Sequence, residues 1–177
     1  MLIQFSVENF LSFKEKQIFS MLATKDESHP EHIVPVSDGV RKPLLRTAAL
    51  YGANASGKSN LIKAMKFAQN LVVEGTDAHH QILITPFKLC APSDEPSKFQ
   101  FIFSWKGIEY TYGFSLTPSQ ILEEYLYATA IGERMYFERI TNTEGITEAK
   151  LGPSLSSGKK GLKQYFKYKV ADTRSND

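Results

Sequence analysis

The sequence predicts an α/β fold in which a strand–loop–helix unit is joined to an antiparallel sheet. Residues 52–59 read GANASGKS, which completes the G-x-x-x-x-G-K-S/T phosphate-binding pattern. Apolar residues then recur at helical spacing over residues 58–73, and from residue 98 their period changes to two. These observations predict a phosphate-binding core followed by a β-subdomain.

The first predicted element is a half-buried strand, because apolar and polar residues alternate along residues 3–8. Asn9 suits a turn, and residues 11–13 and 17–22 are predicted to form two further strands or strand-like pieces. Residues 24–43 are rich in charge, proline and histidine, which is typical of a long loop.

The loop at residues 52–59 has the residue types that phosphate binding requires. The two glycines allow the backbone to curl around phosphate oxygens, Lys58 supplies a point charge, and the Ser59 hydroxyl is a ligand for Mg²⁺. The residues predicted to contact the nucleotide are Gly52, Ala53, Asn54, Ala55, Ser56, Gly57, Lys58, Ser59 and Asn60. Ser59 is also the predicted metal ligand.

The flanks of the loop favour this interpretation, because a phosphate-binding loop lies between a buried strand and a helix. Residues 47–51 form a short apolar run that predicts a central parallel strand. The predicted apolar stripe of the helix is Leu61, Ala64, Met65, Ala68, Leu71 and Val72. Gly75 can end the helix. The alternative is a glycine-rich turn that matches the motif by chance. It would require Lys58, Ser59 and both flanking segments to fit the motif by coincidence.

An antiparallel meander is predicted for the second half of the chain. Residues 99–105 and 108–116 alternate around the short turn Lys106-Gly107, which predicts a hairpin with one apolar face. Further strands are predicted over residues 121–131, 134–140 and 146–150, with turns at Gly132-Glu133 and residues 142–145. The aromatic stripe of the hairpin is interpreted as core rather than as a platform for nucleic-acid bases.

Composition describes an ordinary globular protein. The 177 residues are 42% hydrophobic and 23% charged, enough for one domain with a core. The single cysteine, Cys90, excludes an intramolecular disulfide and suits a reducing cytosol, so we expect a cytoplasmic location. No apolar run has the length of a membrane span, and no signal peptide is visible.

The excess of positive charge lies at the C-terminal end of the chain. Residues 1–150 carry 15 basic and 17 acidic side chains, whereas residues 151–177 carry 6 basic and 2 acidic ones. Five of these basic residues are lysines interleaved with Tyr165, Phe166 and Tyr168, a pattern in which bases could stack while lysines meet phosphates. A solvated edge segment is the favoured interpretation.

Two histidine pairs have spacings that could suit a metal ion: His29 with His32, and His79 with His80. Neither pair is accompanied by cysteines or by further ligands at regular spacing. Solvent-exposed histidines are therefore the favoured interpretation.

The opening FSVENFLSF (residues 5–13) and ALYGANASGKSNL (residues 49–61) resemble RecF/SMC-like ATPases, of the ABC-type branch of P-loop proteins. The match is nearest to bacterial AAA family ATP-binding proteins related to OLD nucleases, often found in phage-defence and abortive-infection loci. Residues 86–87, 110–114 and 137–139 also resemble this group, so the resemblance runs along nearly the whole chain.

The resemblance implies the N-terminal part of an ABC-type P-loop ATPase lobe with an antiparallel β-subdomain. Residues 1–90 would be the nucleotide-binding core, 91–150 the β-subdomain, and 151–177 a basic segment truncated inside the ATPase domain. ATP and Mg²⁺ are the implied cofactors. A homodimer around nucleotide and a nucleic-acid or protein effector are the implied partners, with no membrane.

The resemblance also suggests roles for three polar residues. In such ATPases the turn after the first strand lies near adenine, which makes Asn9 and Ser12 candidates for base or ribose contacts. A glutamine after the helix senses the γ-phosphate, and Gln81 is the only glutamine between residues 70 and 99.

Two parts that hydrolysis requires are not found in the sequence. The family's Mg²⁺-binding, water-activating acids end an apolar strand, whereas residues 121–124 (ILEE) lack the Asp and fall in the meander. Residues 155–159 imitate the signature motif but are interpreted as a loop. We therefore assign no catalytic residue and expect an N-terminal fragment. The functions left open are an ATPase half, a non-catalytic nucleotide-binding or scaffold module and, less favoured, a P-loop kinase.

Overall fold

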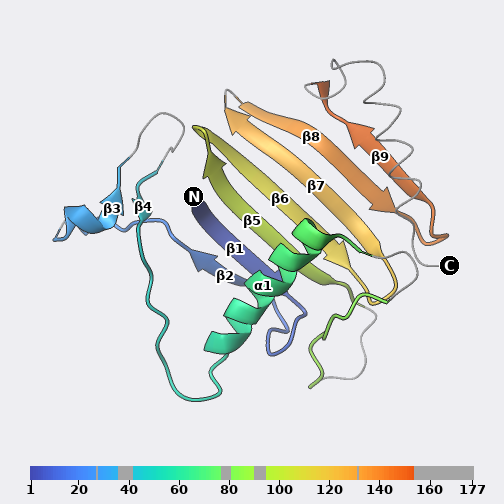
Figure 1. The fold of residues 1–177 in the computed structure, drawn as a ribbon, viewed down its shortest axis with the longest axis horizontal. Coiled ribbons are helices and arrows are strands. Elements are labelled where there is room, and N and C mark those ends of the chain that lie inside the picture. The colour runs from blue at the N-terminus through green and yellow to red at the C-terminus, as the bar shows by residue number, and fades with distance from the viewer. Residues whose placement is uncertain (27, 36–41, 77–80, 90–94, 131, 154–177) are drawn as a thin grey trace.

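The computed structural model describes residues 1–26, 28–35, 42–76, 81–89, 95–130 and 132–153. Its elements, in chain order, are β1 (Leu2–Glu8), β2 (Gln17–Ser20), the 3₁₀ helix η1 (Pro30–His32), β3 (Ile33–Val34), β4 (Leu44–Leu45), α1 (Lys58–Glu74), β5 (Ser97–Trp105), β6 (Ile108–Leu116), β7 (Ile121–Ala130), β8 (Gly132–Thr141) and β9 (Thr147–Leu151). In these described residues the fold is mainly antiparallel sheet with one α-helix (Figure 1).

One seven-stranded sheet dominates the molecule, in the order β2-β1-β5-β6-β7-β8-β9. The predicted five-stranded meander is confirmed as β5 to β9. The predicted strand at residues 3–8 is also confirmed, and it joins the same sheet by pairing with β5. Strands from both predicted subdomains therefore share one sheet. The division into residues 1–90 and 91–150 stays a prediction.

The hairpin of β5 and β6 forms as its turn residues predict. Lys106 (φ 48°) and Gly107 (φ 79°) both have positive φ, which matches the twist of two antiparallel strands. In this register Phe99 faces Phe114, and their stacked rings lie 5.2 Å apart between centroids. Both side chains are almost fully buried, which supports the interpretation of the stripe as core.

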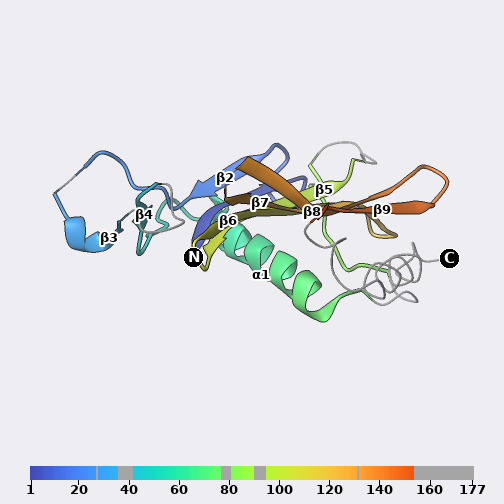
Figure 2. The same ribbon diagram turned by 90° about the horizontal axis from the view of Figure 1, so that it is seen from above.

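Helix α1 crosses one face of the sheet (Figure 2). Ala64 and Ala68 are fully buried, and their small side chains let the helix approach the sheet closely. The core between them consists of Phe5, Val7, Phe10, Ala64, Ala68, Phe99, Phe114 and Leu116. The predicted stripe is confirmed except at Val72, which is 49% exposed, whereas Phe67 packs against the core instead.

The predicted parallel strand at residues 47–51 is wrong. This segment has no regular structure, and Leu50 and Tyr51 are 43% and 91% exposed. A central strand needs neighbours that pair with its N–H and C=O groups. Every strand pairing in the described residues is antiparallel and none involves this segment, so the α/β layer expected around the loop is not formed there.

Three smaller predictions also change. Residues 11–13 form a turn closed by an isolated bridge between Phe10 and Phe13, rather than a strand. The long loop predicted at 24–43 contains η1 and β3. Gly132 and Glu133 already pair with β7, so β8 begins earlier than the predicted turn allowed.

No helix in the described part of the chain is long and apolar enough to cross a membrane. Several residues discussed in the sequence analysis lie outside the described residues. They are Cys90, His79, His80, the signature-like residues 155–159 and the basic segment with Tyr165, Phe166 and Tyr168.

Candidate functional site

The predicted phosphate-binding loop leads directly into α1, and its last two residues, Lys58 and Ser59, are the first two of the helix. The loop backbone has positive φ at three positions, Gly52 (154°), Ala55 (62°) and Gly57 (94°). Gly57 is also the N-cap of the helix. Its positive φ and the closeness of neighbouring side chains both favour glycine at this position. A Cβ atom at this position would lie 3.3 Å from Ser12 Oγ.

The Lys58 ammonium group is held by the loop itself. Its Nζ donates hydrogen bonds to the carbonyl oxygens of Gly52 (2.8 Å) and Ala53 (2.7 Å), and to Ser56 Oγ (3.3 Å). The Lys58 side chain therefore folds back over the loop. Its positive charge and its N–H donors lie close to the backbone of residues 52–56.

The loop and the start of the helix are accessible to solvent. Residues 52–56 and Ser59 are exposed, so the Ser59 hydroxyl can be reached by a hydrated metal ion. Leu61 N–H makes the first intrahelical hydrogen bond, to Gly57 O at 3.0 Å, and the first turn has no acidic residue. The first N–H groups of α1, which have no intrahelical partner, and the helix dipole make this end attractive to an anion.

The turn after β1 packs against the loop. Asn60 Nδ2 donates a 2.9 Å hydrogen bond to Ser12 Oγ, linking residues far apart in sequence. Ser12 therefore lies beside the start of α1, and its role as a nucleotide contact stays a prediction. Both residues were predicted from the sequence as nucleotide contacts, but no sequence pattern predicted the hydrogen bond between them.

Asn9 has a structural role, which corrects its predicted contact with base or ribose. The residue is 6% exposed, and its Nδ2 donates to Glu95 O at 2.6 Å. Its Oδ1 accepts from Phe87 N–H at 3.1 Å. Because both ends of the amide bind backbone groups, Asn9 fastens the turn to the segment before β5.

Gln81 is at the wrong end of the helix to sense a γ-phosphate. It lies with Glu74, Gly75 and Thr76 around a hollow at the C-terminal end of α1. A helix of 17 residues is about 25 Å long, so this hollow is far from Lys58. The sequence left the identity of the glutamine sensor open, because sequence distance from the motif does not show the direction of the returning chain.

Glu124, the nearest imitation of a catalytic acid, is engaged within the sheet. Its Oε1 accepts from the Tyr112 hydroxyl at 2.6 Å, and its Oε2 accepts from Arg139 Nε at 2.6 Å. The pKa of the Tyr112 hydroxyl is raised, mainly because the side chain is buried. The phenol therefore stays protonated and donates the hydrogen bond to Glu124. These contacts support a structural role, although Glu124 is partly buried rather than a surface residue.

A helix that carries a phosphate-binding loop and packs on an antiparallel sheet is consistent with a P-loop ATPase-like domain. The model of one family, described as "AAA domain, putative AbiEii toxin, Type IV TA system", matches residues 48–147. This match spans more than half of the chain, and the chain belongs to this family of AAA domains, within the AAA/ABC-like P-loop ATPases. No curated protein and no solved structure matches the chain.

Proposed function

We propose that this chain is the ATP-binding module of an AAA/ABC-type ATPase. The observation that carries the proposal is the loop at residues 52–57, over which the Lys58 side chain folds back at the N-terminus of α1. This arrangement concentrates a flexible cation, glycine-rich backbone and a helix N-terminus at one exposed point, and these are the groups that bind polyphosphates.

Each residue of the loop has a proposed part in binding Mg-ATP. The backbone N–H groups of residues 52–57 would cradle phosphate oxygens, and Lys58 would exchange its bonds to the loop for the β- and γ-phosphates. The exposed Ser59 hydroxyl would bind Mg²⁺. Asn60, held by Ser12, would keep the turn after β1 beside the nucleotide.

We further propose that the module belongs to the RecF/SMC/OLD-like ABC branch and forms a homodimer around nucleotide in the full-length protein. There it would couple ATP binding and hydrolysis to a nucleic-acid-directed or phage-defence effector. The opening residues 5–13 support the branch. The description of the family, "AAA domain, putative AbiEii toxin, Type IV TA system", supports the defence context.

Substitution of Lys58 tests the central proposal. Lys58→Ala should reduce the affinity for Mg-ATP by at least about tenfold, because a charge-assisted hydrogen bond contributes about 1.5–3 kcal/mol. Titration calorimetry with ATP measures this change. Lys63→Ala removes another lysine from the same helix, one that is exposed, and should leave the affinity unchanged.

Circular dichroism of both variants separates binding from folding. If Lys58→Ala folds normally and binds Mg-ATP as tightly as the unsubstituted chain, the assignment of the loop is wrong. Lys58→Arg, which keeps the charge but changes its shape, should give an intermediate affinity.

A second function is a nucleotide-binding or scaffold module that needs a partner to hydrolyse ATP. The observation that favours it is the engagement of Glu124 by Tyr112 and Arg139, which leaves this glutamate unavailable to Mg²⁺ or to an attacking water. In this case ATP would bind at the same loop, and the catalytic acids would come from elsewhere.

A further inference from the structure

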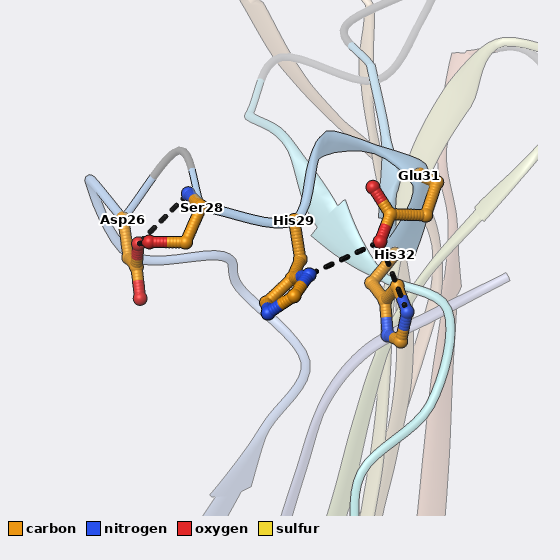
Figure 3. A network of polar contacts seen from close by, with 5 residues as sticks. All are labelled: Asp26, Ser28, His29, Glu31 and His32. Carbon is orange, nitrogen blue, oxygen red and sulfur yellow. Dashed lines mark hydrogen bonds and ion pairs between the residues drawn. The ribbon is translucent and has the colours of Figure 1, made fainter.

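Two imidazoles and one carboxylate converge on the short 3₁₀ helix in the segment before the phosphate-binding loop (Figure 3). His29 Nδ1 lies 3.1 Å from Glu31 Oε1, and His32 Nε2 lies 3.4 Å from the same oxygen. The three potential ligand atoms all lie within 4.8 Å of one another. The sequence suggested the histidine pair without a further ligand, and the fold supplies Glu31 as the third.

The backbone explains why these side chains meet. Pro30 is the first residue of η1, and its ring restricts φ to a value suited to the turn. His32 N–H donates to His29 O at 3.1 Å, which closes the turn and brings the two imidazoles to the same side. Arg46 N–H donates to His32 O at 2.9 Å, so the turn is also tied to the chain after β4.

The separations match those between ligands of a tetrahedral metal ion. With metal–ligand bonds of about 2.0–2.1 Å, two ligand atoms in tetrahedral geometry lie roughly 3.3 Å apart. The two contacts to Glu31 Oε1, 3.1 and 3.4 Å, are close to this value. Small rotations of the two exposed rings would complete the set, since the third separation is also within 4.8 Å.

We propose that His29, Glu31 and His32 form a binding site for a late first-row divalent metal ion, with Zn²⁺ as the expected occupant. Imidazole nitrogen with one carboxylate suits Zn²⁺, Cu²⁺ or Ni²⁺, whereas Mg²⁺ and Ca²⁺ prefer oxygen ligands throughout. The three side chains are 75%, 62% and 68% exposed, so water completes the coordination. The ion would link the three side chains of this single turn and so stabilise η1, and this site is independent of the proposed nucleotide site.

Metal titration of the untagged 177-residue chain tests the proposal. Zn²⁺ titrated calorimetrically should bind with a stoichiometry of one at this site, and Co²⁺ should give the visible d–d absorption of a bound ion. His29→Ala, His32→Ala and Glu31→Gln should each weaken Zn²⁺ binding by at least about tenfold, since loss of even an outer-shell partner costs that much. Because the side chains are exposed, these variants should fold normally.

The double substitution of His79 and His80 by alanine is the matched control. It removes the other histidine pair and should leave the Co²⁺ spectrum and the Zn²⁺ affinity of the remaining site unchanged. Absence of Zn²⁺ binding to the unsubstituted chain would overturn the proposal. So would binding that survives His29→Ala and His32→Ala but disappears with the control substitution.

Discussion

At the scale of single residues, Lys58 and Ser59 are adjacent in sequence but differ in their surroundings. Lys58 Nζ is bonded to three oxygen atoms of its own loop, whereas Ser59 is exposed at the first turn of α1. This difference means that the two side chains can be tested separately, one for its charge and the other for its metal contact.

Ser59→Ala should weaken binding of Mg-ATP by about tenfold or more, and binding of metal-free ATP much less. The reason is that the hydroxyl is proposed to be a ligand of Mg²⁺ rather than of phosphate. Calorimetric titrations of ATP with Mg²⁺ and with EDTA measure the two affinities.

Ser59→Thr is the control, because it retains the hydroxyl that the motif allows at this position. It should bind Mg-ATP nearly as well as the unsubstituted chain. Equal losses for Ser59→Ala with and without Mg²⁺ would argue against the metal role.

Asn9 and Gln81 show why residue type alone cannot assign a contact with the nucleotide. Both are amides that could bind a nucleotide, and both occur in regions that the family resemblance highlights. In the structure Asn9 is bound at both ends by backbone groups of a distant segment, and Gln81 lines a hollow at the C-terminal end of α1. Such contacts depend on which backbone groups come near, and local sequence does not record this.

At the scale of elements, the helix and the hairpins are predicted well, and the central strand is not. Helix α1 and the turn at Lys106-Gly107 are specified by periodicity and by turn residues within a few positions. A strand at 47–51 would require a neighbour elsewhere in the chain. None of the described strands pairs there, and the segment remains irregular.

The pairing of β9 with β8 ends at a glycine that tolerates no side chain. A Cβ atom on Gly152 would lie 1.6 Å from Met135 O, and Gly152 N–H donates to Tyr136 O at 2.8 Å. Gly152→Ala should therefore push β9 away from β8 and destabilise the fold by about 1–3 kcal/mol. Urea unfolding and amide exchange over residues 147–151 measure the effect.

Glu148→Ala is the control for this strand, because the Glu148 side chain is exposed on β9. Its effect should stay within about 0.5 kcal/mol. If Gly152→Ala leaves both stability and exchange unchanged, the close approach of β9 to Met135 is not present in solution.

At the scale of the whole molecule, one helix covers only part of a long sheet. An apolar groove of about 790 Å³ runs along α1, with Ile62, Met65 and Val72 on the helix side. Phe101, Phe103 and Tyr112 line it on the sheet side. Among the described residues, the buried core is therefore concentrated under the middle of α1, with the apolar groove beside it.

The isolated chain should release phosphate from Mg-ATP no faster than its Lys58→Ala variant. The physical reason is that hydrolysis needs an acid to orient water, and the Glu124 carboxylate is already bonded to Arg139 and Tyr112. A phosphate-release assay at saturating Mg-ATP measures this, with calorimetry to verify that nucleotide is bound. Turnover that depends on Lys58 would contradict this prediction and the second proposed function.

Patterns within a few residues were enough to predict the phosphate-binding loop, α1 and the β5–β9 meander, because helical period, strand alternation and turn chemistry act locally. Contacts between distant residues could be read only from the tertiary structure. They include the pairing of β1 with β5 and the bond between Asn60 and Ser12. The structure also showed that no described strand pairs with residues 47–51. Such pairings depend on how the chain returns in space, which no local period encodes.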